Sequence, residues 1–403
     1  MAVVHPIARA WISTGGTGAR NYDEFADDAE ITAIIAANPE SALAIEMPHR
    51  APDSLGKDFA SALPDAVERL SRQRADGSYA PAENVIAAYR IWEPGRLDEA
   101  AYGIFAMVDT GQISTSADEP GLVIRNEDVF LDKVRERVAL AQATNHLLSP
   151  VLLLQTARGD QLHKAIGEVV DLDRPPAVTD TDHAGRIHAV WPLPADSPAA
   201  VELLALAGGG ELVVADGNHR TLAAQMAGLG RFLAVITTPA SVTIEPYHRL
   251  IVDSPLRVGE LTARLDAMGG ALVGPARPGG PGARGHVHLY GDGDRWDVRL
   301  PSGPGSGVEA MDHALVERYV LRDALGLDPG DKRVVYVGGD YPPEWLAGEV
   351  DAGRADLAIL IPPVTVDEFV QVNLDRAKMP RKSTWFTPKA RAGLVLADLG
   401  AEG

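Results

Sequence analysis

Six consecutive residues in the sequence DGNHRT, from Asp216 to Thr221, combine an acid, a glycine and several hydrogen-bond donors. An arginine can bind a phosphate through two hydrogen bonds, and a carboxylate such as Asp216 can hold Mg²⁺ or orient a hydroxyl. Glycine lets an anion approach the backbone closely. We therefore predict a phosphate site. The residues expected to bind the phosphate are Gly217, Asn218, His219, Arg220 and Thr221.

Elements on both sides of this motif position it. The apolar run from Leu212 to Ala215 predicts a buried strand, and Asn218 to Ala227 predicts a helix. The first turn of a helix has unpaired N–H groups and the positive end of the dipole, so it binds anions readily. In the alternative interpretation, Asp216 only caps the helix and Arg220 is a solvated surface residue. The density of donors and acceptors directly after a strand favours the phosphate site.

Composition excludes several classes of protein. The chain has 403 residues, 46% of them hydrophobic, which predicts two or three structural units. It contains no Cys, so disulfides and thiolate chemistry are excluded. We expect no signal peptide and no membrane span, and we predict a cytoplasmic protein. The formal net charge of −19 makes a nucleic acid an unfavourable partner, whereas a small phosphate in a pocket responds mainly to local donors.

Short strands and helices alternate through the middle of the chain, which predicts an α/β fold. Strands are expected over Val151–Gln155 and Phe232–Thr237, and a helix over Asp132–Ala143. We also predict a strand over Ser41–Met47 and one helix over Val308–Leu325. The predicted organisation is an N-terminal α/β region (1–115), a phosphate-binding core (116–255) and a C-terminal α/β region (256–403).

The motif DGNHR resembles the DG(H/N)HR signature of the ParB/sulfiredoxin-like fold. Further segments resemble a family known as domain of unknown function 1015. They are NYDEF near residue 22, AANPESALAI at 36–45, IRNEDVFLDKVRERVALAQATNHLLSPVLLL at 124–154 and MPRKSTWFTPKARAGLVLADL at 379–399. They occur in the family's order over nearly the whole chain. The resemblance implies a ParB/sulfiredoxin-like core between the two flanking α/β regions.

A more distant resemblance is to ParB-like free L-serine kinases, which phosphorylate serine with ADP or ATP. The matching series comprises Asn126-Glu127, Ser149-Pro150, DGNHR and, near the C-terminus, Lys382-Ser383-Thr384. By this resemblance Glu127 is the general base, and Asp216 and His219 are catalytic. Lys382, Ser383 and Thr384 contact substrate or phosphate. The family commonly has His on both sides of the Glu; here Asn126 and Asp128 stand there, which puts metal use and substrate choice in doubt.

Four other residues match family positions. Tyr22 and Asp23 are expected to line the site, and His248 and Arg249 are candidates for substrate or phosphate contact, with a packing or capping role equally open. The Gly-rich segment at 13–24 lacks the GxxxxGK[ST] pattern and is interpreted as a flexible loop. His286 and His288 alternate on an expected strand but have no obvious third ligand, so no metal is predicted there.

The predicted function is that of a kinase, a phosphotransferase with an alcohol group as acceptor. It would transfer a phosphoryl group from ATP or ADP, with Mg²⁺, to the hydroxyl of free L-serine or a similar small metabolite. The C-terminal region is expected to return Lys382 to the pocket. Two alternatives use the same phosphate site: a ParB-like regulator that binds CTP or ATP, and a nuclease or phosphatase with water as the acceptor.

Overall fold

The computed structural model describes residues 3–25, 27–116, 118–119, 121–125, 127, 129–170, 174–276, 278–301 and 307–401. They form a mixed α/β protein, which confirms the predicted fold class. The chain divides into two compact units. Unit 1 comprises Met1–Val242 and Pro388–Gly403, and unit 2 comprises Thr243–Thr387. The three-region division and the ParB/sulfiredoxin-like core stay predictions.

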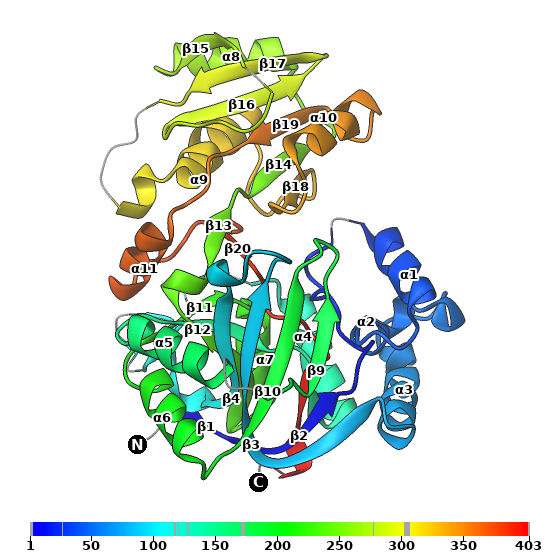
Figure 1. Ribbon diagram of the computed structural model, residues 1–403. Coiled ribbons are helices and arrows are strands. Elements are labelled where there is room, and N and C mark those ends of the chain that lie inside the picture. Colours follow the sequence, from blue (N-terminus) through cyan, green and yellow to red (C-terminus); the bar gives the residue numbers. More distant parts are fainter. Residues whose placement is uncertain are drawn as a thin grey trace. The chain divides into compact units, whose positions relative to one another are not determined.

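A mixed sheet, 13-stranded within the described residues, forms the framework of unit 1. Its main path runs β5-β6-β11-β8-β12-β4-β3-β2-β21-β7; in addition, β1 pairs with β4, and β10 with β3 and β9. The strands are β1 (Val4–His5), β2 (Ile7–Ser13), β3 (Tyr79–Trp92), β4 (Ala101–Asp109), β5 (Ile113–Ser114), β6 (Val123–Ile124), β7 (His146–Leu147), β8 (Val151–Gln155), β9 (Val178–Thr181), β10 (Ile187–Pro194), β11 (Leu212–Asp216), β12 (Arg231–Thr237) and β21 (Val395–Asp398). The long strand β3 curves, so its first half pairs with β2 and its second half with β4 (Figure 1).

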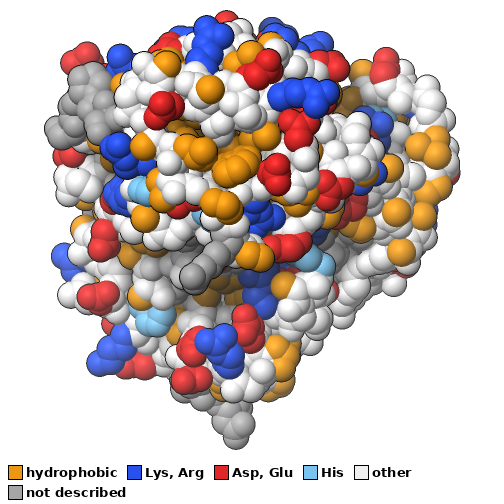
Figure 2. Space-filling view, turned by 90° about the horizontal axis from the view of Figure 1, so that it is seen from above, with side chains coloured by type: hydrophobic (Ala, Val, Ile, Leu, Met, Phe, Trp, Pro, Cys, Tyr) orange, Lys and Arg blue, Asp and Glu red, His pale blue; other side chains and the backbone are white. Residues whose placement is uncertain are grey.

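Charged side chains of both signs share the face of the molecule that Figure 2 shows. On the face shown in Figure 2, Lys and Arg lie among Asp and Glu, and the side chains coloured there form no broad basic patch. A surface that binds a nucleic-acid backbone needs such a patch, because phosphate neutralisation supplies much of the affinity. Separately, none of the helices in the described ranges combines the length and the apolar character that a bilayer span requires.

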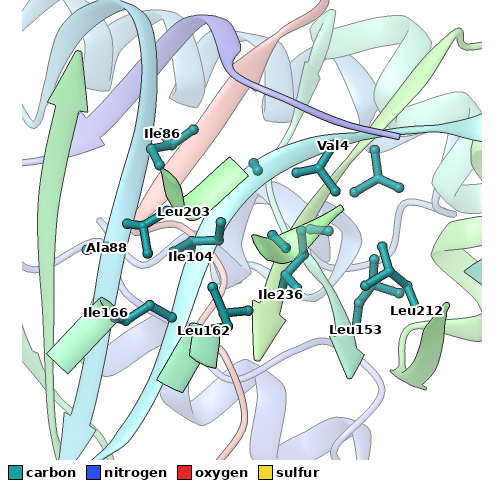
Figure 3. Packing of buried hydrophobic residues seen from close by; sticks show 14 of the residues in the cluster. Val4, Ile86, Ala88, Ile104, Leu153, Leu162, Ile166, Leu203, Leu212 and Ile236 are labelled. Atoms are coloured by element: carbon teal, nitrogen blue, oxygen red, sulfur yellow. The ribbon is translucent and has the colours of Figure 1, made fainter. Parts of the chain in front are cut away.

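Helices cover the sheet of unit 1. Helix α5 packs on β3 and β4 and against α6, while α4 packs against α7. In the core, Ile104 of β4 lies close to Leu162 of α5, and Leu153 of β8 lies beside Leu212 of β11 in the same cluster (Figure 3). Each such buried side chain contributes about 1.5–3 kcal/mol. The helices are α1 (Asp28–Ala37), α2 (Leu43–Glu46), α3 (Leu63–Ala75), α4 (Leu131–Thr144), α5 (Gly159–Val170), α6 (Pro198–Ala207) and α7 (Asn218–Met226), with short 3₁₀ turns η1 (Pro48–Arg50), η2 (Pro52–Ser54), η3 (Ala60–Ala62), η4 (Leu97–Glu99), η5 (Thr110–Gln112), η6 (Pro239–Ser241) and η9 (Leu399–Ala401).

The predicted strand at Ser41–Met47 is wrong, because the chain forms helix α2 there. All four residues of α2 are buried. A short apolar run that is buried on every side has no periodicity that separates a strand from a helix. The strand predicted at Val151–Gln155 is confirmed as β8, and the helix predicted at Asp132–Ala143 as α4.

Unit 2 contains an antiparallel sheet of order β15-β17-β16-β19-β14-β18, and β13 pairs with β20. Its strands are β13 (Thr243–Glu245), β14 (His248–Ile251), β15 (Ala271–Pro275), β16 (His286–Gly291), β17 (Asp294–Arg299), β18 (Val334–Val337), β19 (Leu357–Leu360) and β20 (Trp385–Thr387). Its helices are α8 (Val258–Ala267), the 3₁₀ turn η7 (Gly307–Ala310), α9 (Asp312–Leu315), the π-helical segment η8 (Val316–Leu325), α10 (Pro343–Asp351) and α11 (Val366–Leu374). The single helix predicted over Val308–Leu325 begins too early, because Met311 is extended (φ −70°, ψ 142°) and separates η7 from α9.

The buried His248 of β14 makes the stability of unit 2 depend on pH. Burial lowers the pKa of its imidazole to about 3, and its Nδ1 accepts a hydrogen bond from the backbone N–H of Ile361 at 3.1 Å. In the unfolded chain the imidazole of His248 binds a proton near pH 6.5, whereas in the folded chain it stays neutral down to about pH 3. The folded state therefore loses about 1.4 kcal/mol of stability per pH unit as the pH falls below about 6.5. We expect the free energy of unfolding to drop by about 2 kcal/mol less between pH 7 and pH 5 in His248→Gln than in the unmodified chain. Urea titrations at both pH values measure this; equal drops would contradict the assignment.

Candidate functional site

The predicted strand–glycine–helix junction is present in unit 1. Strand β11 ends at Asp216, and the register against β8 shifts between Val214 and Asp216. Such a bulge redirects the side chain that follows it. Gly217 is the N-cap of α7 in the left-handed conformation (φ 99°), and it supplies no side-chain cap to the helix. A buried helix start whose N-cap residue supplies no side-chain acceptor is an arrangement that suits an anion.

Gly217 has a second reason to be glycine besides its φ angle. A Cβ atom there would lie 3.0 Å from Arg220 Nε and 3.2 Å from Val151 Cα. We predict that Gly217→Ala lowers the free energy of unfolding by about 2 kcal/mol or more, since a left-handed alanine alone costs about 1–2 kcal/mol. Thermal unfolding measures this loss. The matched control is Gly228→Ala, at φ +68° with nothing within 4 Å of a Cβ; equal losses in the two variants would exclude a role for the close approach.

Asp216 is held between two cations. Its Oδ2 accepts from Arg220 Nη2 at 2.5 Å, and its Oδ1 accepts from Lys389 Nζ at 3.3 Å. Because each oxygen already pairs with a cation, this arrangement does not favour Asp216 as a metal ligand. Within the described ranges, no three His, Asp or Glu side chains are grouped so that they could hold a metal ion. Mg²⁺ at Asp216 stays a prediction.

Arg220 is buried and braces the junction. Besides Asp216, its guanidinium donates to Asn21 Oδ1 at 2.9 Å and to the Pro150 carbonyl at 2.7 Å. Burial alone would lower the pKa of Arg220, but Asp216 and neighbouring acidic groups raise it overall. The alternative interpretation is wrong on both points, because the N-cap is Gly217 and Arg220 is not solvated. The guanidinium therefore ties the start of α7 to Asn21 and Pro150, and phosphate binding by Arg220 stays a prediction.

Two other side chains of the motif also bond within the protein. The Thr221 hydroxyl donates to the Asn218 carbonyl at 2.8 Å. His219 Nε2 accepts from the backbone N–H of Phe130 at 3.1 Å, and the two rings stack with an interplanar angle of 9°. An imidazole that accepts at Nε2 is neutral and carries its proton on Nδ1. These contacts fix the first turn of α7.

Glu127 lies at the same helix start. The Asn218 side-chain amide donates to Glu127 Oε2 at 3.4 Å. Asn218 is only 8% exposed, and its Oδ1 is buried without a hydrogen-bond partner among the described residues. Asn126 and Asp128 lie outside the described residues. The structure thus brings a carboxylate and an unsatisfied amide oxygen to the start of α7.

The N-terminal segment around Asn21 adds buried charge to this site. The Asn21 amide donates to Glu24 Oε1 at 2.5 Å, and Glu24 is 5% exposed. Burial raises the pKa of Glu24, and Lys389 opposes that rise. Tyr22 is also buried. Burial raises the pKa of its phenol above the usual value, and the negative charge of Asp23 raises it as well. Tyr22 and Asp23 therefore lie at the buried charges of the junction, whereas the sequence reasoning missed Asn21 and Glu24.

Lys389 is the cation that the sequence reasoning missed. It follows Pro388 in the closing segment MPRKSTWFTPKARAGLVLADL, the same segment from which Lys382 was chosen. Its place in a segment that resembles the family was the one sequence feature that could have marked Lys389 as a site residue. Lys389 belongs to unit 1, whereas Lys382, Ser383 and Thr384 belong to unit 2. Lys382 Nζ lies 5.6 Å from the centre of the Tyr247 ring, and the return of Lys382 to the pocket stays a prediction.

His248 and Arg249 lie side by side on β14 of unit 2 and make packing contacts there. Arg249 is fully buried, donates to the carbonyls of Tyr247 and Arg381, and stacks on the Tyr336 ring at 4.2 Å. These bonds hold β14 within its own unit. Substrate or phosphate contact by either residue stays a prediction.

Three comparisons place the chain among known proteins. Comparison with curated proteins gave no match. Among solved structures it is similar to a free serine kinase in complex with AMP (12% identity, TM-score 0.40, covering 74% of this chain and 93% of that chain). It is also similar to a conserved hypothetical protein from Pyrococcus furiosus (14% identity, TM-score 0.37, covering 72% of this chain and 95% of that chain). A third similar structure is SbnI with a C-terminal truncation from Staphylococcus aureus (14% identity, TM-score 0.39, covering 72% of this chain and 85% of that chain). The family model described as "Protein of unknown function (DUF1015)" matches residues 17–317, and the chain belongs to this family, as its sequence predicted.

Proposed function

We propose that the chain is a small-molecule kinase that transfers a phosphoryl group from a nucleotide to an alcohol hydroxyl. The observation that carries this proposal is the uncapped, buried start of α7 with the Glu127 carboxylate beside it. The helix start suits the phosphate and the carboxylate suits the acceptor proton, the two requirements of phosphoryl transfer to an alcohol.

The proposed step divides the work among residues of unit 1. The N–H groups at the start of α7 hold the phosphates, and Glu127 accepts the proton of the attacking hydroxyl. The new bond forms between the hydroxyl oxygen and the terminal phosphorus, while the bond from that phosphorus to the nucleotide oxygen breaks. Lys389, 13% exposed and paired with Asp216, supplies a cation for the developing negative charge. Magnesium, where bound with the nucleotide, would neutralise further phosphate charge.

The acceptor proposed first is free L-serine, through the resemblance of DGNHR, Glu127 and the closing Lys-Ser-Thr to the free L-serine kinases. The test incubates the full chain with Mg²⁺, labelled ATP or ADP, and a panel of hydroxy amino acids. Phosphorylated amino acid is the expected product. Intact nucleotide binding with no phosphorylated product from any acceptor would reject the kinase, and release of free phosphate alone would favour the phosphatase alternative.

The regulator alternative has less support from α7 itself. Arg220 is the one Lys or Arg among the nine residues of this helix, all of which are described, and it is buried against Asp216. A helix that presents a basic stripe to DNA needs exposed cations. Binding of CTP or ATP without turnover, together with retention of duplex DNA, would reverse this preference.

A further inference from the structure

A pocket of about 50 Å³ lies within unit 1 beside the start of α7. Glu46, Arg137 and Ser149 line one part of it, and apolar side chains such as Ala141 and Phe232 line the rest. One water molecule needs roughly 10–15 Å³ of such space, so the pocket has room for a few water molecules. The pocket therefore suits a molecule of a few heavy atoms with one polar and one apolar end.

The polar end of this pocket has unmet hydrogen-bonding capacity. Glu46 is 2% exposed; its Oε1 accepts from the Ser149 hydroxyl, but its Oε2 has no partner among the described residues. Arg137 is 6% exposed; its Nη2 donates to the Glu46 carbonyl at 3.0 Å, while its Nε and Nη1 have no acceptor in the described part of the chain. Buried charged atoms without partners are costly, and both side chains line this pocket, so a ligand that carries the complementary charges would offset that cost.

The guanidinium of Arg137 is held in place before any ligand binds. Its central carbon lies 4.0 Å from the centre of the Tyr22 ring and 5.1 Å from that of Phe59. Stacking between aromatic rings fixes the plane in which its N–H groups point. A planar, fixed guanidinium recognises a carboxylate with little further loss of freedom.

We propose that this pocket binds a small α-amino acid, with its ammonium group at Glu46 and its carboxylate at Arg137. One acidic and one basic side chain line the same part of the pocket, and a zwitterion supplies a further partner to both at no net charge. An acid or an amine alone would pair with only one of the two. The apolar wall accepts a short side chain.

This inference deepens the proposed function and rests on it for the role of the amino acid as phosphoryl acceptor. Arg220 lines the pocket and is also in the first turn of α7, so the pocket adjoins the proposed phosphate site. An amino acid bound there with its side chain toward Arg220 would present its hydroxyl to the proposed phosphate site. Free serine carries the groups that this chemistry requires: an ammonium group, a carboxylate and a side-chain hydroxyl.

Calorimetric titration of the full chain, without nucleotide, tests the pocket. The probes are L-serine, ethanolamine, which lacks the carboxylate, and glycolate, which lacks the ammonium group. We expect serine to bind and the two single-charge probes to bind at least tenfold more weakly. Glu46→Gln and Arg137→Met should each weaken serine binding at least tenfold. Equal binding of the three probes, or no binding of serine, would overturn the inference.

A second variant keeps the test valid if those buried charge changes prevent folding. Ala141→Leu fills the pocket from α4 without removing a charge, and we expect it to abolish serine binding. Its control is Ala143→Leu, on the same helix but exposed. Serine binding that survives Ala141→Leu would exclude this pocket. If serine binds but no phosphoryl transfer follows, the kinase fails and the pocket stands; if transfer proceeds equally in Ala141→Leu, the pocket fails and the kinase stands.

Discussion

Replacing Glu127 by Gln will lower the rate of phosphoryl transfer by about 10²–10⁴-fold, the usual effect of losing a general base. Gln retains the shape of the side chain and a carbonyl oxygen that can accept from the Asn218 amide, which donates to Glu127 at 3.4 Å. It cannot take the proton of the attacking hydroxyl. Nucleotide affinity should therefore change little while turnover falls. Initial rates at saturating nucleotide and direct nucleotide titration measure the two quantities separately.

The control for this prediction is Glu83→Gln, which removes an exposed carboxylate paired with Arg9 on the sheet of unit 1. It should leave both turnover and nucleotide affinity unchanged. Undiminished turnover in Glu127→Gln would remove the assignment of Glu127 as the base. Equal losses of turnover and nucleotide affinity would instead assign it to binding.

Replacing Arg220 by Met will lower the free energy of unfolding of unit 1 by about 3–5 kcal/mol, the usual cost of breaking a buried ion pair from one side. The substitution leaves the Asp216 carboxylate with Lys389 alone and deprives the Asn21 side chain and the Pro150 carbonyl of a donor. Methionine fills similar space, so the loss reports the charge and its hydrogen bonds rather than a cavity. Denaturant titration measures it.

The control for the second prediction is Arg135→Met, which removes an exposed arginine paired with Asp132 at 2.9 Å. Exposed pairs contribute about 0–1 kcal/mol, so this variant should unfold almost as the unmodified chain does. Equal losses in the two variants would mean that Arg220 is as hydrated as a surface residue, contrary to its 8% exposure.

The parts of the site that the sequence predicted are those set by local residues. Strand β11, Gly217 and helix α7 follow one another within a few residues, and each has a local signal: an apolar run, a glycine and a helical stretch. Type and spacing predicted Arg220 as a phosphate ligand, and that role stays a prediction. Its burial against Asp216, in contrast, depends on packing that no local pattern reveals.

The parts that were missed depend on contacts between distant residues. Lys389 meets Asp216 across 173 positions of sequence, and Asn21 meets Arg220 across 199. Each is an ordinary polar residue in its own segment. Periodicity and turn chemistry describe neighbours along the chain, so they cannot pair such residues. The strand predicted at Ser41–Met47 was wrong for a different reason. A short run that is buried on every side shows no alternation of polar and apolar residues that would separate a strand from a helix.

Strand β21 lies between β2 and β7 in the sheet, so the sheet that the first 242 residues begin is completed by residues 395–398. On the ribosome these last strand residues emerge only after the whole of Thr243–Thr387, a delay of roughly 7–30 s at about 5–20 residues per second. A nascent chain stopped anywhere in unit 2 already contains Glu127 and the whole DGNHR segment. It still lacks both strand β21 and the ammonium group of Lys389, so the site is assembled only after unit 2 and the segment that follows it have been translated.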